Sequence, residues 1–344
     1  MQLYNKLSAE ERAKIIDENS QERIILSFYK YFNLGNPTLF RDHLYIEWAS
    51  IDVLGRIYVA NEGINAQLSV PSENLEIFKK SINEISPLND VRLNIALEHY
   101  SKSFLKLTIK IKEKIVADGL DDKTFDVTKI GEHLDAQRFN QMLDNKNTVC
   151  IDMRNHYESE IGYFNGAIKP NVDTFRESLE IIDNELEKNG KEKNYLMYCT
   201  GGIRCEKASA YLIHKGIKNV FQLEGGIIEY TRQVKDKKLK NNFLGKNFVF
   251  DERRGERISD DIVSNCHQCG KPCDTHINCI NESCHLLFIQ CEDCKEKMNS
   301  CCSSECMEIN ELSYDQQKAL RKGRHNSNKI FKKGRSAKLK FKIN

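Results

Sequence analysis

The 344-residue chain lacks the features that would mark it as secreted, membrane-spanning or dinucleotide-dependent. No segment approaches the roughly eighteen consecutive apolar residues of a transmembrane helix. Residues 1–12 are charged and contain no apolar core of the kind found in a secretory signal. No glycine fingerprint for a flavin or a nicotinamide cofactor is present. The net charge of +2 indicates no particular partner. We therefore expect a cytoplasmic protein.

Length and cysteine content bound the remaining possibilities. A chain of 344 residues with 40% hydrophobic content can form the cores of two or three domains. It contains 13 cysteines, which is many for a cytoplasmic protein. Because disulfides are rare in that compartment, the cysteines indicate metal binding or catalysis.

One glycine-rich turn combines a cysteine with an arginine. Residues 196–198 predict a buried strand, Cys199 ends it, and residues 207–215 predict a helix. The backbone N–H groups between them can converge on one point above the helix N-terminus, which forms an anion cradle. The helix dipole and the Arg204 guanidinium should lower the pKa of Cys199 and favour the reactive thiolate. The predicted cradle consists of Thr200, Gly201, Gly202 and Ile203.

The length of this loop indicates which kind of group it can hold. Phosphatases that use the same design need a longer loop, whereas the short loop from Cys199 to Arg204 suits the outer sulfur of a persulfide. The loop resembles that of the rhodanese (sulfurtransferase) superfamily. Residues 149–168 resemble the D-x-R…E…G…F-x-G-A-I stretch of that superfamily, and residues 220–226 resemble its closing strand and loop. The resemblance extends over roughly residues 130–235 and implies that Cys199 and Arg204 are catalytic.

The segments on either side of this region predict different folds. The N-terminal part reads as β-α-β-β-α-β, the ferredoxin-like or acylphosphatase-like α+β pattern, after a helical lead-in within residues 1–20. Its expected strands are 23–32, 55–60, 64–70 and 104–111, and its expected helices are 39–49 and 72–85. An acidic linker is expected at 118–126. Strands and helices then alternate at 148–153, 175–186, 195–199, 207–215 and 220–223, which predicts a parallel α/β sheet with its active site at the strand carboxyl ends. A lysine-rich connector is expected at 234–246.

Ten of the 13 cysteines lie between residues 266 and 306. Paired cysteines at short spacing indicate tetrahedral zinc, and so short a segment needs a metal to hold it together. Consecutive pairs could share an ion, or alternate pairs could do so in a cross-brace, which we favour, with Cys266, Cys269, Cys291 and Cys294 on one ion. His267, His276 and His285 could each replace a cysteine. The eight predicted ligands of about two structural zinc ions are Cys266, Cys269, Cys279, Cys284, Cys291, Cys294, Cys302 and Cys306.

The C-terminal tail, residues 321–344, has ten Lys and Arg residues, no acidic residue, and Phe331 and Phe341 among them. Such a tail suits the phosphate backbone of a nucleic acid, and a merely solubilising role is the alternative. We thus expect a multidomain α/β protein with a ferredoxin-like domain at 1–120, a rhodanese domain at 121–240, a cysteine-rich module at 241–310 and a basic tail at 311–344.

This order of domains resembles the tRNA uridine hydroxylase family. The stretches G-R-I-Y-V-A-N-E-G-I-N-A at 55–66, C-T-G-G-I-R-C-E-K-A at 199–208, C-H-Q-C-G at 266–270 and C-C-S at 301–303 carry the resemblance. It implies an oxidoreductase that uses molecular oxygen to convert wobble uridine of tRNA to 5-hydroxyuridine, with Cys199 bearing a persulfide. The alternatives are a sulfurtransferase that passes sulfane sulfur from a donor to a thiol, cyanide or a tRNA base, and a non-enzymatic, zinc-stabilised RNA-binding protein.

Several other residues have two interpretations. Cys205 either resolves the persulfide as a disulfide or is buried against the sheet. Asp152 and Arg154 are expected to form an ion pair that supports the loop. Asn61, Glu62 and Asn65 either contact RNA or stabilise a hairpin turn. The histidines form no defensible two-His-one-carboxylate set. We expect four histidines outside the cysteine-rich segment to lie at the surface or in capping positions: His43, His99, His133 and His156.

Overall fold

The computed structural model describes residues 3–120, 126–322, 336 and 339. The chain forms two compact units. The first comprises Met1–Arg154, Gly166–Asn241 and Val249–Arg253, and the second comprises Asn155–Asn165, Asn242–Phe248 and Arg254–Asn344. Among the described helices, none combines the length and the apolar character that crossing a bilayer requires.

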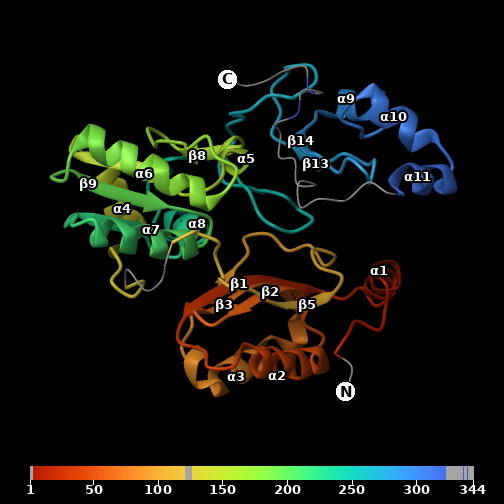
Figure 1. The fold of residues 1–344 in the computed structure, drawn as a ribbon, viewed down its shortest axis with the longest axis horizontal. Coiled ribbons are helices and arrows are strands. Elements are labelled where there is room, and N and C mark those ends of the chain that lie inside the picture. The colour runs from red at the N-terminus through yellow and green to blue at the C-terminus, as the bar shows by residue number, and fades with distance from the viewer. Residues whose placement is uncertain (1–2, 121–125, 323–335, 337–338, 340–344) are drawn as a thin grey trace. The chain divides into compact units, whose positions relative to one another are not determined.

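The first unit begins with helix α1 (Ala9–Glu18) and a five-stranded sheet of order β4-β1-β3-β2-β5. Helices α2 (Pro37–Ser50) and α3 (Leu75–Glu84) cover one face of this sheet (Figure 1). Alternating apolar residues of the strands meet the helices in a core around Trp48, whose ring contacts both Phe28 and Phe78. The strands are β1 (Arg23–Tyr31), β2 (Leu54–Ala60), β3 (Gly63–Pro71), β4 (Asn94–Ile95) and β5 (Leu107–Ile111), and short 3-10 turns lie at Ser72–Asn74 and Ser86–Leu88.

The ferredoxin-like, acylphosphatase-like fold is confirmed, and the predicted last strand is present but is shorter and lies at a different edge of the sheet than this fold requires. The expected strand at 104–111 begins only at Leu107, and as β5 it pairs in parallel with β2 at one edge of the sheet. The fourth position of the fold is taken by β4, which pairs antiparallel with β1 at the opposite edge. Because β4 has only two residues, it leaves no alternating pattern in the sequence.

The central sheet is parallel, as predicted, with strand order β6-β10-β9-β7. Its strands are β6 (Glu132–Leu134), β7 (Thr148–Asp152), β9 (Asn194–Tyr198) and β10 (Val220–Leu223), and its helices are α4 (Ala136–Leu143), α6 (Phe175–Asn189), α7 (Ile203–His214) and α8 (Gly226–Asp236). The expected connector at 234–246 was wrong, because α8 extends to Asp236 and a strand begins at Phe243. The acidic linker that we expected at 118–126 does not begin as an exposed segment, because Asp118 is buried. Residues 121–125 lie outside the described residues.

The second unit contains a three-stranded sheet of order β12-β11-β8 and a two-stranded hairpin. Strand β8, from the segment that resembles rhodanese, pairs antiparallel with β11, so this segment contributes to both units. The elements are α5 (His156–Ser159), β8 (Gly162–Phe164), β11 (Phe243–Asn247), β12 (Glu256–Arg257), β13 (His276–Asn278), β14 (Leu287–Ile289), α9 (Glu292–Lys297), α10 (Ser304–Glu311) and α11 (Tyr314–Arg321).

The predicted basic tail lies largely outside the described residues, including Phe331 and Phe341. Its described part begins with α11, which ends at Arg321. Further along, Leu339 is only 3% exposed and packs in the apolar cluster that contains Cys279 and Phe288. At least this position of the tail is therefore part of the packed module.

Candidate active site and cysteine clusters

Cys199 lies where β9 ends and the glycine-rich turn leads into α7. The turn brings the backbone N–H of Gly202 to 3.1 Å from Cys199 Sγ. Gly202 has φ +105°, which favours glycine, and it caps α7. The turn is backed by Gly226, where a Cβ would lie 2.6 Å from the carbonyl oxygens of Cys199 and Thr200. Close backbone packing at Gly202 and Gly226, which a side chain would disturb, therefore shapes this turn.

The surroundings of Cys199 lower the pKa of its thiol to about 6. Burial alone would raise it, since a charge is poorly solvated there. A hydrogen bond from Cys205, the charge of Arg204 and the N–H groups of Arg204 and Gly202 together outweigh burial. Cys199 is therefore largely a thiolate at neutral pH. Burial raises the pKa of Cys205, which stays protonated and donates to Cys199.

The ionisation of Cys199 predicts a measurable pH dependence. We expect the ultraviolet thiolate absorbance of the wild-type chain minus that of Cys199→Ser to rise with a midpoint near pH 6, and the Arg204→Gln substitution to move it upward. Since the pKa is lower in the folded state than its usual value of 9.0, the unfolding free energy should gain a contribution as pH rises from about 6 to 9 that is absent below pH 6. A midpoint near 9 would contradict this assignment.

The predicted ion pair of Asp152 and Arg154 is confirmed, and both side chains are fully buried. Arg154 binds the two carboxylate oxygens through Nε and Nη2, and the Tyr198 hydroxyl donates to Asp152 Oδ2 at 2.8 Å. Because Tyr198 directly precedes Cys199, this network fixes the end of β9 and hence the start of the loop. Its role is positional, as the sequence indicated.

The five-stranded sheet lies against the loop, a contact that the sequence did not reveal. Asn94 Nδ2 on β4 donates to the Gly201 carbonyl at 3.4 Å. Tyr29 on β1 donates to Glu206 Oε1 at 2.9 Å, and a Cβ on Gly202 would lie 2.7 Å from its hydroxyl. Cys199 itself is 1% exposed. A substrate can therefore reach Sγ only when groups around the loop move.

A buried charge network connects the sequence motif at 55–66 with the motif at 199–208. Lys207 Nζ, fully buried on α7, contacts Glu62 Oε2 at 2.7 Å and also Asp118. Glu62 accepts the Ile115 N–H through its other oxygen, and Asp118 also binds Lys114. The charge of Lys207 is thus compensated by carboxylates from two other segments, as a buried ammonium requires. The structure therefore supports a structural role for Glu62 rather than a contact with RNA.

The four scattered histidines differ from one another. His133 was expected at the surface or in a capping position. Its Nε2 instead lies 3.1 Å from Glu206 Oε1 beside the loop. That hydrogen bond raises the pKa of His133, although burial opposes it. His99 Nδ1 accepts the N–H of Ile25. His43 is exposed, and His156 begins the short helix α5.

Eight cysteines form two groups in which all sulfur atoms lie within 4.8 Å of one another. The groups join alternate pairs along the chain, which is the arrangement that the cross-brace prediction requires and that sharing between consecutive pairs does not. The first group is Cys266, Cys269, Cys291 and Cys294, and the second is Cys279, Cys284, Cys302 and Cys306. The remaining cysteines of the segment, Cys273 and Cys301, belong to neither group.

The histidines of this segment replace no cysteine in either group. His267 lies 2.6 Å from Glu160, and His285 contacts Asn278. His276 is buried against the Phe248 ring. The expectation that they could serve as ligands is therefore not met within the two groups.

The donor set of each group fits zinc. Four thiolates at the corners of a tetrahedron with Zn–S bonds of about 2.3 Å lie roughly 3.8 Å apart. Neighbouring sulfur atoms here are 3.6 Å apart for Cys269 and Cys291, and 3.7 Å for Cys302 and Cys306. In both groups a backbone N–H also points at one sulfur at 3.4 Å, from Cys291 to Cys266 and from Cys302 to Cys279. Such N–H groups stabilise metal-bound thiolates.

Family models agree with this architecture. Residues 23–115 match the UPF0176 acylphosphatase-like domain, residues 135–233 match the rhodanese-like domain, and residues 244–307 match the rhodanase C-terminal model. The fold and the loop thus define a rhodanese-type protein with an acylphosphatase-like domain before it and a cysteine-rich module after it.

Similar proteins extend over nearly the whole chain. It is 54% identical to a tRNA uridine(34) hydroxylase of Photorhabdus laumondii, over 97% of this chain and 95% of the relative. It is 52% identical to that of Pectobacterium carotovorum, over 97% and 94%, and 53% identical to that of Leptospira interrogans, over 97% and 90%. The chain therefore belongs to the tRNA uridine(34) hydroxylase family.

Proposed function

We propose that this protein hydroxylates uridine 34 of tRNA to 5-hydroxyuridine with Cys199 as its catalytic residue. The observation that carries the proposal is the position of Cys199 Sγ, 3.1 Å from the Gly202 N–H in an intact Cys-to-Arg loop that opens α7. The relatives that resemble the chain over 97% of its length bear the name of this activity. An ionised thiol surrounded by N–H donors is arranged for nucleophilic chemistry rather than for structural support alone.

Cys199 is suited to take up sulfane sulfur. Its thiolate attacks the outer sulfur of a donor such as thiosulfate, so that a new S–S bond forms, the S–S bond of the donor breaks and sulfite leaves with the electron pair. The Gly202 N–H, 3.1 Å from Sγ, and the Arg204 charge then face the negative charge of the persulfide. Arg204 lies over the Phe250 ring, which helps to hold its guanidinium in place.

Hydroxylation places one oxygen atom of O₂ between C5 of the uracil ring and the hydrogen on that carbon. The other atom leaves as water, and its reduction consumes a pair of electrons and two protons from an external reductant. The two cysteine groups would hold zinc as structural ions, because all four ligand positions of each are protein sulfurs and no position is left for a substrate. The ten cationic side chains of the tail would contribute attraction to the tRNA phosphates.

The proposal is tested by nucleoside mass spectrometry of tRNA from a strain that lacks the gene. We expect 5-hydroxyuridine to disappear and to return when the wild-type chain is expressed. An unchanged 5-hydroxyuridine content would overturn the proposal. A sulfurtransferase that uses the same Cys199 thiolate would then be favoured, provided that the chain turns over thiosulfate with small thiol acceptors.

A further inference from the structure

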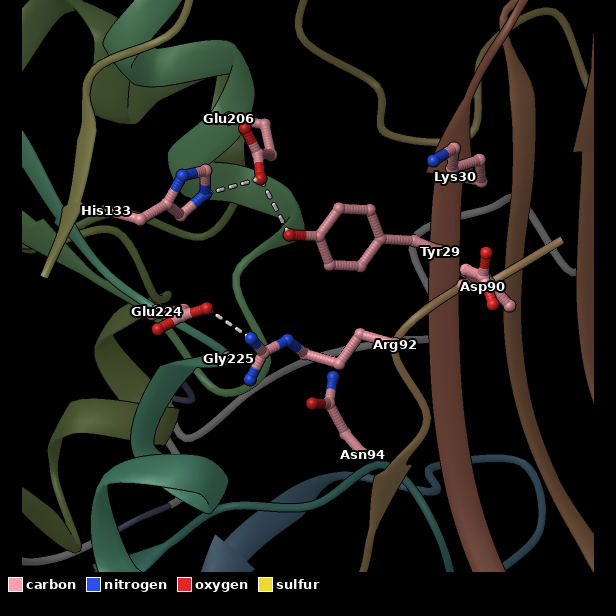
Figure 2. A pocket seen from close by; sticks show the side chains of 10 residues that line it. Tyr29, Lys30, Asp90, Arg92, Asn94, His133, Glu206, Glu224 and Gly225 are labelled. Carbon is pink, nitrogen blue, oxygen red and sulfur yellow. Dashed lines mark hydrogen bonds and ion pairs between the residues drawn. The ribbon is translucent and has the colours of Figure 1, made fainter. Parts of the chain in front are cut away.

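The first unit contains a cavity of about 330 Å³ beside the loop. Figure 2 shows side chains from residues 29–94 facing side chains from residues 133–225 across it. Tyr29 points from β1 toward Glu206 on α7, while His133 approaches the same carboxylate from the other side (Figure 2). A volume of this size lies at the lower end of the range for small-molecule pockets, about 300–1,000 Å³, and suits one nucleotide-sized group.

This pocket adjoins the cradle of Cys199. Asn94, which lines the pocket, donates to the Gly201 carbonyl. Gly225, which also lines it, directly precedes Gly226, the residue packed under the loop. A group bound here therefore lies next to the backbone that presents the thiolate.

The charges around the pocket favour a neutral ligand. The cations Lys30 and Arg92 are balanced by acidic side chains, and Arg92 forms an ion pair with Glu224. A phosphate would need an excess of positive charge, which this lining lacks. A neutral ring with hydrogen-bonding edges, such as a nucleobase, suits it better.

One residue that lines the pocket has an acceptor without a partner among the described residues. Asn94 is 3% exposed, and its Oδ1 atom makes no hydrogen bond to any described residue. Because the Gly201 carbonyl can only accept, the atom that faces it must be Nδ2, which leaves Oδ1 as the unpaired acceptor. A buried acceptor without a donor is costly, so this atom calls for a donor from a ligand. Glu206 is less available, since Tyr29, Gln222 and His133 already surround its oxygens.

We propose that this pocket binds the uracil ring of uridine 34 and that Asn94 Oδ1 accepts its N3–H. The inference rests on the proposed function and adds the residue that sets base specificity. Neutral cytosine has no hydrogen on N3, so it leaves Asn94 Oδ1 unpaired. A site built around an acceptor rejects a ligand without the matching donor.

The test measures binding of the full-length chain to two anticodon stem-loops that differ only in uridine or cytidine at position 34, by fluorescence anisotropy. The wild-type chain should prefer the uridine stem-loop by about tenfold, the usual discrimination of one specific base contact. Asn94→Leu, which keeps the side-chain shape but has no acceptor, should bind both equally. Asn94→Asp, which keeps an acceptor, should retain the preference. Asn89→Leu makes the same change at an exposed position outside the pocket and should behave as wild type.

A third stem-loop makes the test independent of protein variants. N3-methyluridine at position 34 removes the donor, so the wild-type chain should bind it as weakly as the cytidine stem-loop. Equal affinity of the wild-type chain for all three RNAs, or a full uridine preference in a folded Asn94→Leu chain, would overturn the pocket assignment. A clear uridine preference without any 5-hydroxyuridine in complemented cells would instead overturn the proposed function and leave the pocket intact.

Discussion

The Cys199→Ser chain should leave tRNA without 5-hydroxyuridine when it is expressed in a strain that lacks the gene. A serine hydroxyl does not ionise near neutral pH and cannot carry a sulfane sulfur, so the substitution removes both the charge and the nucleophile. We expect a loss of at least about a thousandfold in activity, as is usual when a catalytic nucleophile is removed. The measurement is the ratio of 5-hydroxyuridine to uridine in purified tRNA, with the amount of expressed protein determined in parallel.

Cys150→Ala provides the matched control. Cys150 is a buried cysteine on β7, in the same sheet as the strand that leads to Cys199, but burial raises the pKa of its thiol well above the usual value. It is therefore protonated and has no part in the loop. Its alanine variant should restore 5-hydroxyuridine. If Cys199→Ser restored it equally well, the cysteine would not be catalytic and the role of the loop would have to be reconsidered.

The residues that the sequence predicted well are those whose chemistry is local. Cys199 and Arg204 are close in the chain, so a turn and a helix start suffice to place them around one point. Asp152 and Arg154 are likewise neighbours at the end of one strand. The cysteine pairs have short internal spacings, and the choice between consecutive and alternate pairing was the only non-local question in that segment.

The residues that the sequence could not identify depend on contacts between distant segments. Asn94 meets Gly201 across 107 positions of the chain, and its strand is only two residues long. Glu206 was visible in a motif, but its partners Tyr29 and His133 come from a different sheet and from the strand β6 that the pattern missed. Propensity and periodicity describe neighbours along the chain, so they carry no signal for such pairs.

The Lys207 network shows why two distant motifs occur together. Glu62 follows β2 in the hairpin turn, whereas Lys207 lies on the helix behind the loop. Without Lys207 the Glu62 carboxylate would lose its cationic partner, whereas Lys207 also contacts Asp118. Losing one partner of a buried pair typically costs about 3–5 kcal/mol. The N-terminal signature and the active loop are thus linked by one electrostatic requirement.

Metal removal should have the largest effect on stability. In the apolar cluster of the C-terminal module, three of the seven buried residues are the ligand cysteines Cys279, Cys302 and Cys306. Its main aliphatic and aromatic members are Leu286, Phe288 and Leu339. So small a core cannot offset the conformational entropy of the segment. Zinc binding by thiolate sites provides about 10–16 kcal/mol, which is as large as the whole stability of a typical domain, about 5–15 kcal/mol. A strong chelator should therefore unfold this module, as a loss of its protection against proteolysis would show.

Elemental analysis with cysteine variants tests the ligand assignment. The wild-type chain should contain two zinc ions, one for each group. Cys269→Ala should reduce this to about one, because three sulfurs bind zinc less tightly than four. Cys273→Ala is the matched control, since Cys273 lies in the same loop region but in neither group, and it should keep both ions. Equal zinc loss in the two variants would contradict the assignment. If the wild-type chain contained no zinc and still resisted protease, packing alone would hold the module together. A fold that depends on metal would unfold when the metal is lost.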